Sequence, residues 1–165
     1  MMDTLRALVR FFEAVGQVAA IILLVVVVLG VGVFIWLGAV SRRMPPSVSP
    51  TGGPLRTGDS KPNWVSTTTH KNDVIHYIAP RACVENPIPA LEAALRHGGY
   101  AVVAVTERYI QATARSSRFG FIDDMEFLYD PAAGLLHARS ASRVGRSDLG
   151  MNRRRLTEIF KEAGL

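Results

Sequence analysis

The feature that most constrains this chain is an uninterrupted apolar stretch near its start. Residues 18 to 40 carry no formal charge and include the run IILLVVVVLGVGVFIWLG. As a helix they would extend about 35 Å at ~1.5 Å per residue, enough to cross a bilayer core of about 30 Å. A cleavable signal peptide needs only about 7 to 15 apolar residues before a small-residue cleavage site. The sequence therefore predicts one transmembrane helix over residues 18–40.

The residues before this stretch have an amphipathic helical pattern. Leu5, Leu8 and Phe12 recur at helical spacing, whereas Arg6 and Arg10 fall on the other side. This pattern is typical of a helix at the membrane interface, and we expect residues 1–17 to continue the span in that form. Positive charges are balanced on the two sides of the span, so the flanking charges favour neither orientation.

A stretch without apolar periodicity follows the span. Residues 41–62 read SRRMPPSVSPTGGPLRTGDSKP, with five prolines and three glycines. Such a composition indicates a linker that buries no core. We therefore expect residues 63–165 to form a separate globular domain that lies near the membrane without being held rigidly against it.

Periodicity and breaker residues predict an α+β fold for this domain. Proline at residues 87 and 89 indicates a helix start, and the Gly98-Gly99 pair indicates its end. A last helix, capped by Ser147 or Asp148, would begin near residue 151. Its buried face would comprise Leu149, Asn152, Leu156, Ile159, Phe160 and Ala163. Strands are expected over residues 100–105, 109–115, 121–129 and 135–143, and another over 74–78. The prediction is an antiparallel sheet of four to five strands packed by two helices.

The segment PAAG, residues 131–134, predicts the register of one hairpin. A four-residue loop built on a type I turn takes proline early and glycine where the chain turns left-handed. If Asp130 then faces Leu135, Glu126 lies opposite Arg139. Opposite charges would thus meet on one face of the sheet.

The stretch RSASRVGRSDLGMNRRR, residues 139–155, holds six arginines and one carboxylate, which makes it the main candidate site. Arg139 and Arg143 would share one strand face, with Ser140 and Ser142 on the other. Arginine side chains and the amides at the start of the last helix suit a phosphate or carboxylate ligand. The candidate binding residues are Arg115, Arg118, Asp124, Glu126, Arg139, Ser140, Ser142, Arg143, Ser147, Asp148, Asn152 and Arg153.

Two alternatives to anion binding remain open from the sequence. The same arginines can be neutralised internally, in a network with the carboxylates of Asp123, Asp124, Glu126 and Asp148. Alternatively, Asp124 and Glu126 can act as a general acid and base or hold a divalent cation. The four histidines lack ligand spacing, and GRSDLG is one residue too long for a nucleophile elbow. We therefore assign no catalytic residue, metal or cofactor.

The charge balance bears on partners. The isoelectric point is about 9.9, and anionic lipid headgroups beneath a tethered domain are an economical partner for such a charge. No aromatic platform interleaves the arginines, which argues against nucleic acid. A single cysteine, Cys83, excludes an intramolecular disulfide. No feature of the sequence identifies a protein partner.

Two motifs resemble a known family. RSSRFGFIDDMEF (115–127) and RSASRVGRSDLGMNRRR (139–155) resemble the bacterial and plastid domain of unknown function 1499, over about residues 59–165. The chain departs from it at Asn63-Trp64-Val65-Ser66, where the family usually has cysteine in place of Trp64. The resemblance implies no activity, but its members are often exported or membrane-anchored. We therefore expect a single-pass protein of the bacterial inner membrane, its domain outside the cytoplasm, acting as a binding or structural module.

Overall fold

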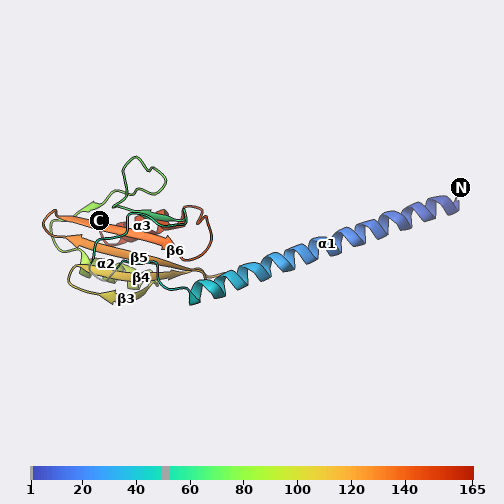
Figure 1. The fold of residues 1–165 in the computed structure, drawn as a ribbon. Coiled ribbons are helices and arrows are strands. Elements are labelled where there is room, and N and C mark those ends of the chain that lie inside the picture. Colours follow the sequence, from blue (N-terminus) through green and yellow to red (C-terminus); the bar gives the residue numbers. More distant parts are fainter. Residues whose placement is uncertain (1, 50–52) are drawn as a thin grey trace. The chain divides into compact units, whose positions relative to one another are not determined.

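The computed structural model describes residues 2–49 and 53–165, and these divide into two compact units, one up to Leu37 and one from Gly38 onward. Helix α1, Met2–Arg43, is continuous and contributes its last six residues to the second unit (Figure 1). Its apolar side chains are exposed along residues 5–36. By length and composition it is long and apolar enough to cross a membrane, a test that a signal sequence near the N-terminus also passes.

The second unit is built on a six-stranded antiparallel sheet. The strand order is β1-β6-β5-β4-β3, with β2 paired to β6 as well. The strands are β1 Trp64–Ser66, β2 Arg81–Ala82, β3 Ala101–Val105, β4 Tyr109–Arg115, β5 Ile122–Asp130 and β6 Leu135–Ser142. This confirms the predicted α+β class, and the two short strands β1 and β2 enlarge the sheet beyond the expected four or five.

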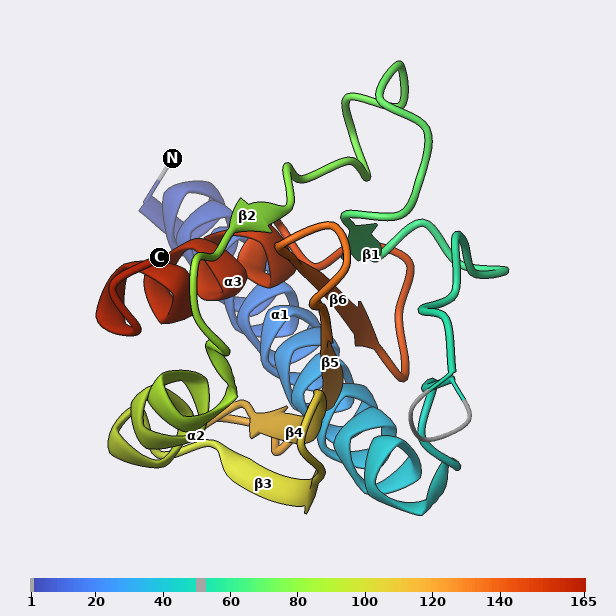
Figure 2. The same cartoon turned by 90° about the vertical axis from the view of Figure 1, so that its left-hand side faces the viewer.

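Two helices cover one face of the sheet, as Figure 2 shows. They are α2, Ile88–His97, and α3, Met151–Glu162. Alternate residues of the strands point toward them and form the apolar core, which includes Ile110, Met125, Phe127, Leu136, Leu91, Leu95, Leu156 and Phe160. The opposite face of the sheet carries polar and charged side chains instead.

The predicted hairpin register between β5 and β6 is confirmed. Asp130 pairs with Leu135, and Glu126 pairs with Arg139. Gly134 has a φ of 63°, as the turn requires. The Asp130 carboxylate also accepts hydrogen bonds from the amides of Ala132 and Ala133, at 3.0 and 3.2 Å. The register therefore follows from local turn chemistry.

Two local predictions are wrong. Residues 74–78 form no strand, and their contact with the sheet is an isolated parallel bridge between Tyr77 and Ser66 of β1. The chain instead makes a turn in which Asp73 accepts from the amide of His76, and Val74 and Ile75 are 80% and 70% exposed. Leu149 does not join the buried face of α3 either, since it precedes the helix and is 93% exposed.

The segment expected to be a free linker packs on the charged face of the sheet (Figure 2). Ser41, Ser49 and Leu55 are buried. The backbone amides of Ser47 and Ser49 donate to carboxylates of β5, each at 2.8 Å. A composition poor in apolar residues excludes a hydrophobic core here, but backbone donors can still satisfy buried charges. Residues 50–52 of the expected linker lie outside the described residues.

These contacts predict where the folding unit begins. A fragment of residues 38–165 should fold, whereas residues 63–165 lack the amides that the buried carboxylates need. Each orphaned buried group costs roughly 1–3 kcal/mol, and a domain has only about 5–15 kcal/mol in total. Thermal unfolding followed by circular dichroism should therefore show a cooperative transition for 38–165 only. Fragment 59–165 is the control, because it keeps the Asp59 carboxylate but lacks the amides of Ser47 and Ser49. Equal melting temperatures for all three fragments would contradict a contribution of these amides to stability.

Candidate functional site

Five charged side chains gather on the sheet face opposite the helices. Asp124 and Glu126 lie on β5, Arg139 lies on β6, and Arg143 follows β6 directly. Asp59 joins them from the segment that covers this face. Because side chains alternate along a strand, the two carboxylates of β5 share one face. We call these five residues the charge cluster.

The Asp124 carboxylate and the Arg143 guanidinium form a two-pronged ion pair. Arg143 donates from Nε to Oδ2 at 2.9 Å and from Nη2 to Oδ1 at 2.7 Å. Its Nη1 donates to the carbonyl of Met44 at 3.0 Å, and Oδ2 of Asp124 also accepts from the amide of Ser47. The pair thereby connects β5 and β6 to the chain that leaves α1.

Glu126 and Arg139 form the second half of the charge cluster. Their ion pair is longer, 3.6 Å between Oε2 and Nη1. Oε1 of Glu126 accepts from the amide of Ser49 and from the Tyr109 hydroxyl at 3.1 Å. Burial raises the pKa of Tyr109, and the negative charge of Glu126 raises it further. The phenol therefore stays a neutral donor.

Arg139 is buried and donates to groups of the covering segment. Nη1 donates to the carbonyl of Ser47 at 2.6 Å, and Nη2 donates to the Asp59 carboxylate at 2.9 Å. Burial lowers the pKa of Arg139, and the charges of Glu126 and Asp59 oppose that shift. For Asp59, partial burial raises the pKa, but hydrogen bonds from Ser47 and Ser60 and the charge of Arg139 outweigh it and lower the pKa below its ordinary 3.8.

The charge cluster is closed to ligands from outside. Asp124, Glu126 and Arg139 have no solvent exposure, and the groups they contact belong to the chain itself. An external anion or substrate would have to displace residues 44–49 and Asp59 together with their hydrogen bonds. The geometry thus matches the internal salt-bridge network that the sequence left open as an alternative.

The predicted site serines face the other side of the sheet. Ser140 donates from Oγ to Oδ1 of Asn152 at 2.6 Å, and Nδ2 of Asn152 donates to Ser142 at 3.1 Å and to the carbonyl of Asn63 at 3.0 Å. Arg155 extends this polar network by donating to Oδ1 of Asn152. These contacts attach α3 to β6 and to the residue before β1.

The amides at the start of α3 already have an acceptor. Asp148 accepts from the amides of Asn152 at 2.8 Å and Gly150 at 3.2 Å, and Ser147 accepts from the amide of Leu149. Arg153 donates to the carbonyls of Val74 and Ile75. The expected anion site at this helix start is therefore filled by the chain's own carboxylate.

Four exposed arginines lie toward one end of the sheet, where α1 ends. They are Arg42, Arg43, Arg115 and Arg118, and we call them the basic end. Arg42 donates to the carbonyls of Phe119 and Gly120, each at 3.4 Å. The amide of Ile122 donates to Ser41 at 2.9 Å. The β4–β5 connection is thus held against the last turn of α1, two residues beyond the apolar stretch.

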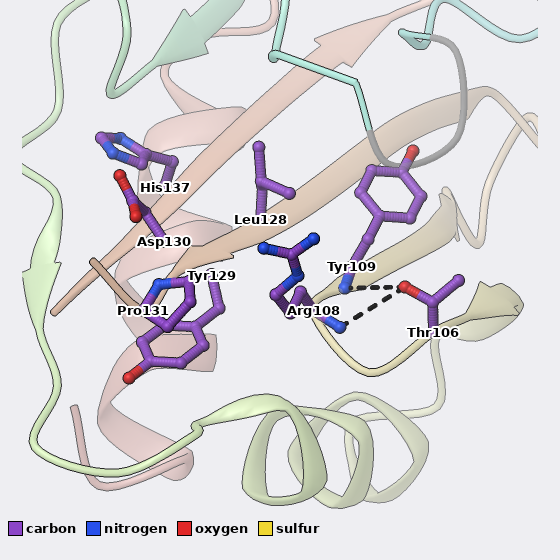
Figure 3. A pocket seen from close by; sticks show the side chains of 8 residues that line it. All are labelled: Thr106, Arg108, Tyr109, Leu128, Tyr129, Asp130, Pro131 and His137. Carbon is purple, nitrogen blue, oxygen red and sulfur yellow. Dashed lines mark hydrogen bonds between the residues drawn. The ribbon is translucent and has the colours of Figure 1, made fainter. Parts of the chain in front are cut away.

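A cavity of about 280 Å³ lies at the other end of the sheet (Figure 3). Thr106 holds its rim by accepting from the amides of Arg108 and Tyr109, at 3.4 and 3.1 Å. Its lining residues are Thr106, Arg108, Tyr109, Leu128, Tyr129, Asp130, Pro131 and His137. None of these residues belongs to the predicted site.

The described residues contain no group of three or more His, Cys, Asp or Glu side chains that could hold a metal ion. Cys83 is half-buried, and burial raises the pKa of its thiol. A raised pKa disfavours the thiolate, the form that reacts or binds metal. Neither observation supports the enzymatic alternative.

Several members of these networks were not predicted. Arg155 lies three residues after Asn152 and pairs with Asp123 at 2.7 Å, so helical spacing could have revealed it. Tyr109 sits on the strand face that carries Glu126, a second usable signal. Asp59 and the Ser47 and Ser49 amides lie in a segment whose composition gives no periodic signal.

The comparison with known families agrees with the two motifs. The profile of a family described as "Protein of unknown function (DUF1499)" matches residues 54–162. That range begins within the segment that covers the charge cluster and ends at the last residue of α3. No curated protein matches the chain.

Substitution within the charge cluster tests its structural role. Asp124→Asn removes the buried carboxylate that pairs with Arg143, whose side chain is 10% exposed, and leaving one partner of a buried pair uncompensated costs about 3–5 kcal/mol. We expect a loss of that size in the free energy of unfolding, measured by chemical denaturation of the full chain in detergent. Glu92→Gln is the control, because its exposed helical pair with Arg96 should contribute only about 0.3–0.5 kcal/mol. Equal losses for the two variants would contradict a structural role.

Proposed function

Because this chain belongs to the DUF1499 family, whose description assigns no activity, we propose a function from its own geometry. The protein is a single-pass, membrane-anchored module of the bacterial inner membrane. Its charge cluster fixes the domain to the end of the anchor, and its basic end binds anionic lipid headgroups. The family resemblance favours a domain outside the cytoplasm.

The observation that carries this proposal is the contact between Arg42 and the β4–β5 connection. Arg42 follows the apolar stretch by two residues, which puts it at headgroup level when residues 18–40 span a bilayer. Because Arg42 donates to the carbonyls of Phe119 and Gly120, the connection lies at the same level. Arg115 and Arg118 are exposed there and face the surface potential of an anionic membrane.

The aromatic residues of the same connection fit this location. The ring centroids of Phe119 and Phe121, in the second half of this connection, lie 6.0 Å apart. Aromatic side chains beside arginines are typical of segments that rest on a membrane surface. The predicted site is thereby divided: Arg139 and Arg143 hold the fold, whereas Arg115 and Arg118 are available for binding.

Anchoring can be tested by the mass of the protein in membranes. An uncleaved anchor leaves the chain at 18.0 kDa and resistant to extraction by alkaline carbonate. Cleavage of a signal sequence would instead release a fragment that lacks the apolar stretch. Intact mass spectrometry of membrane fractions distinguishes the two, and a shortened soluble product would refute the anchor.

Headgroup binding can be tested on the full chain in lipid nanodiscs. Amides of residues 116–121 should exchange hydrogen more slowly in phosphatidylglycerol than in phosphatidylcholine discs. Arg115→Ala with Arg118→Ala should remove about 2 kcal/mol of that protection, from ~1 kcal/mol per basic residue. The same loss is expected in high salt, which screens exposed charges.

Arg96→Ala with Arg108→Ala is the matched control, because both arginines are exposed and neither lies at the basic end. This control should exchange as the unmodified chain does. Exchange that is independent of lipid charge in the unmodified chain would refute headgroup binding and leave the anchor in place.

A further inference from the structure

One exposed residue has an unusual backbone conformation. Leu149 has a φ of 52°, and it is the one non-glycine residue with a positive φ among the described residues. This left-handed region is unfavourable for a side chain with a Cβ, because that atom approaches the next carbonyl oxygen. The side chain is nevertheless 93% exposed. Packing within the domain therefore does not explain a leucine at this position.

The conformation is held by the neighbours of Leu149. Its amide donates to Ser147 Oγ at 3.3 Å, and the following amide, of Gly150, donates to Asp148. The amide of Met151 donates to the Asp148 carbonyl at 3.0 Å. Leu149 is thus the tip of a turn that is fixed on both sides, so the side chain is presented to its surroundings in a defined direction.

The β6–α3 connection, residues 143–150, leaves the sheet at the same end at which α1 ends. The amide of Arg143 donates to the carbonyl of Ile122 at 3.2 Å, and Nη1 of Arg143 donates to the carbonyl of Met44. Figure 1 shows β6 running to this end of the sheet. The connection therefore begins beside Met44, four residues after the apolar stretch ends.

We propose that Leu149 inserts into the lipid at the boundary between headgroups and acyl chains, next to the basic end. Arg146, three residues earlier, is exposed and can meet headgroup phosphates while the leucine enters the apolar layer. Transfer of the leucine side chain from water into the lipid is favourable, and this gain in free energy would offset the cost of the left-handed backbone. This inference rests on the proposed function, since it needs the same end of the sheet to face the bilayer.

A fluorescent label can report on each position in the full chain. Starting from Cys83→Ser, which removes the native thiol, a polarity-sensitive dye is attached at Leu149→Cys, Ser117→Cys or Val84→Cys. Val84 is the matched control because it is an exposed aliphatic residue at the other end of β6, two residues after β2. The chains are placed in phosphatidylglycerol nanodiscs with and without lipids that carry a quencher on the upper acyl chain, and in phosphatidylcholine nanodiscs for comparison.

The expected result is a blue-shifted dye at position 149 that loses at least half of its emission to the quencher. The dye at 84 should show neither effect. A dye at 149 that emits as in water and is not quenched overturns the insertion of Leu149. If position 117 still responds to anionic lipid in that case, headgroup binding stands, whereas silence at both positions overturns both proposals.

A second variant separates membrane contact from a structural role. Asparagine tolerates the left-handed conformation better than leucine does. Leu149→Asn should therefore melt in detergent at the same temperature as the unmodified chain, or higher. In nanodiscs the variant should make the amides of residues 146–151 exchange at least severalfold faster. A lower melting temperature in detergent would instead assign Leu149 to the fold and overturn the proposal.

Discussion

The pair of buried Asp124 and largely buried Arg143 is the interaction on which the rest of this domain depends. A buried charge is tolerated only when it is paired and its remaining donors and acceptors are satisfied. Here the remaining partners are the amide of Ser47 and the carbonyl of Met44. The chain that leaves α1 must therefore run along the sheet. Without it, the two charged side chains would lose these hydrogen-bond partners. The path of residues 44–49 along the sheet follows from this electrostatic requirement.

The two faces of the sheet are covered by different chemistry. Under α2 and α3 the strands contribute apolar side chains, and hydrophobic burial supplies the stability. On the other face an extended segment supplies backbone donors and acceptors to charged side chains. Such a covering is directional, because hydrogen bonds fix the position of each residue.

Patterns with a local cause were predictable from the sequence. Turn chemistry at residues 131–134 set the β5–β6 register, and with it the meeting of Glu126 and Arg139. The helices followed from apolar periodicity and breaker residues. The segment 41–62 was misjudged because its role lies in backbone amides, which no composition reveals. The strands β1 and β2 are two or three residues long and pair with a distant partner, so no periodic pattern could indicate them.

The location of the two family motifs bears on where a function should be sought. DDMEF and RSASR supply Asp124, Glu126, Arg139 and Ser140, all of them buried and bonded within the chain. Buried charged residues specify which segments pack against one another, because each charge needs one particular partner. Binding needs accessible donors, and Arg115, Arg118 and Arg146 are exposed. The two motifs thus combine buried charges that hold the sheet together with exposed arginines toward the end of the sheet at which α1 ends.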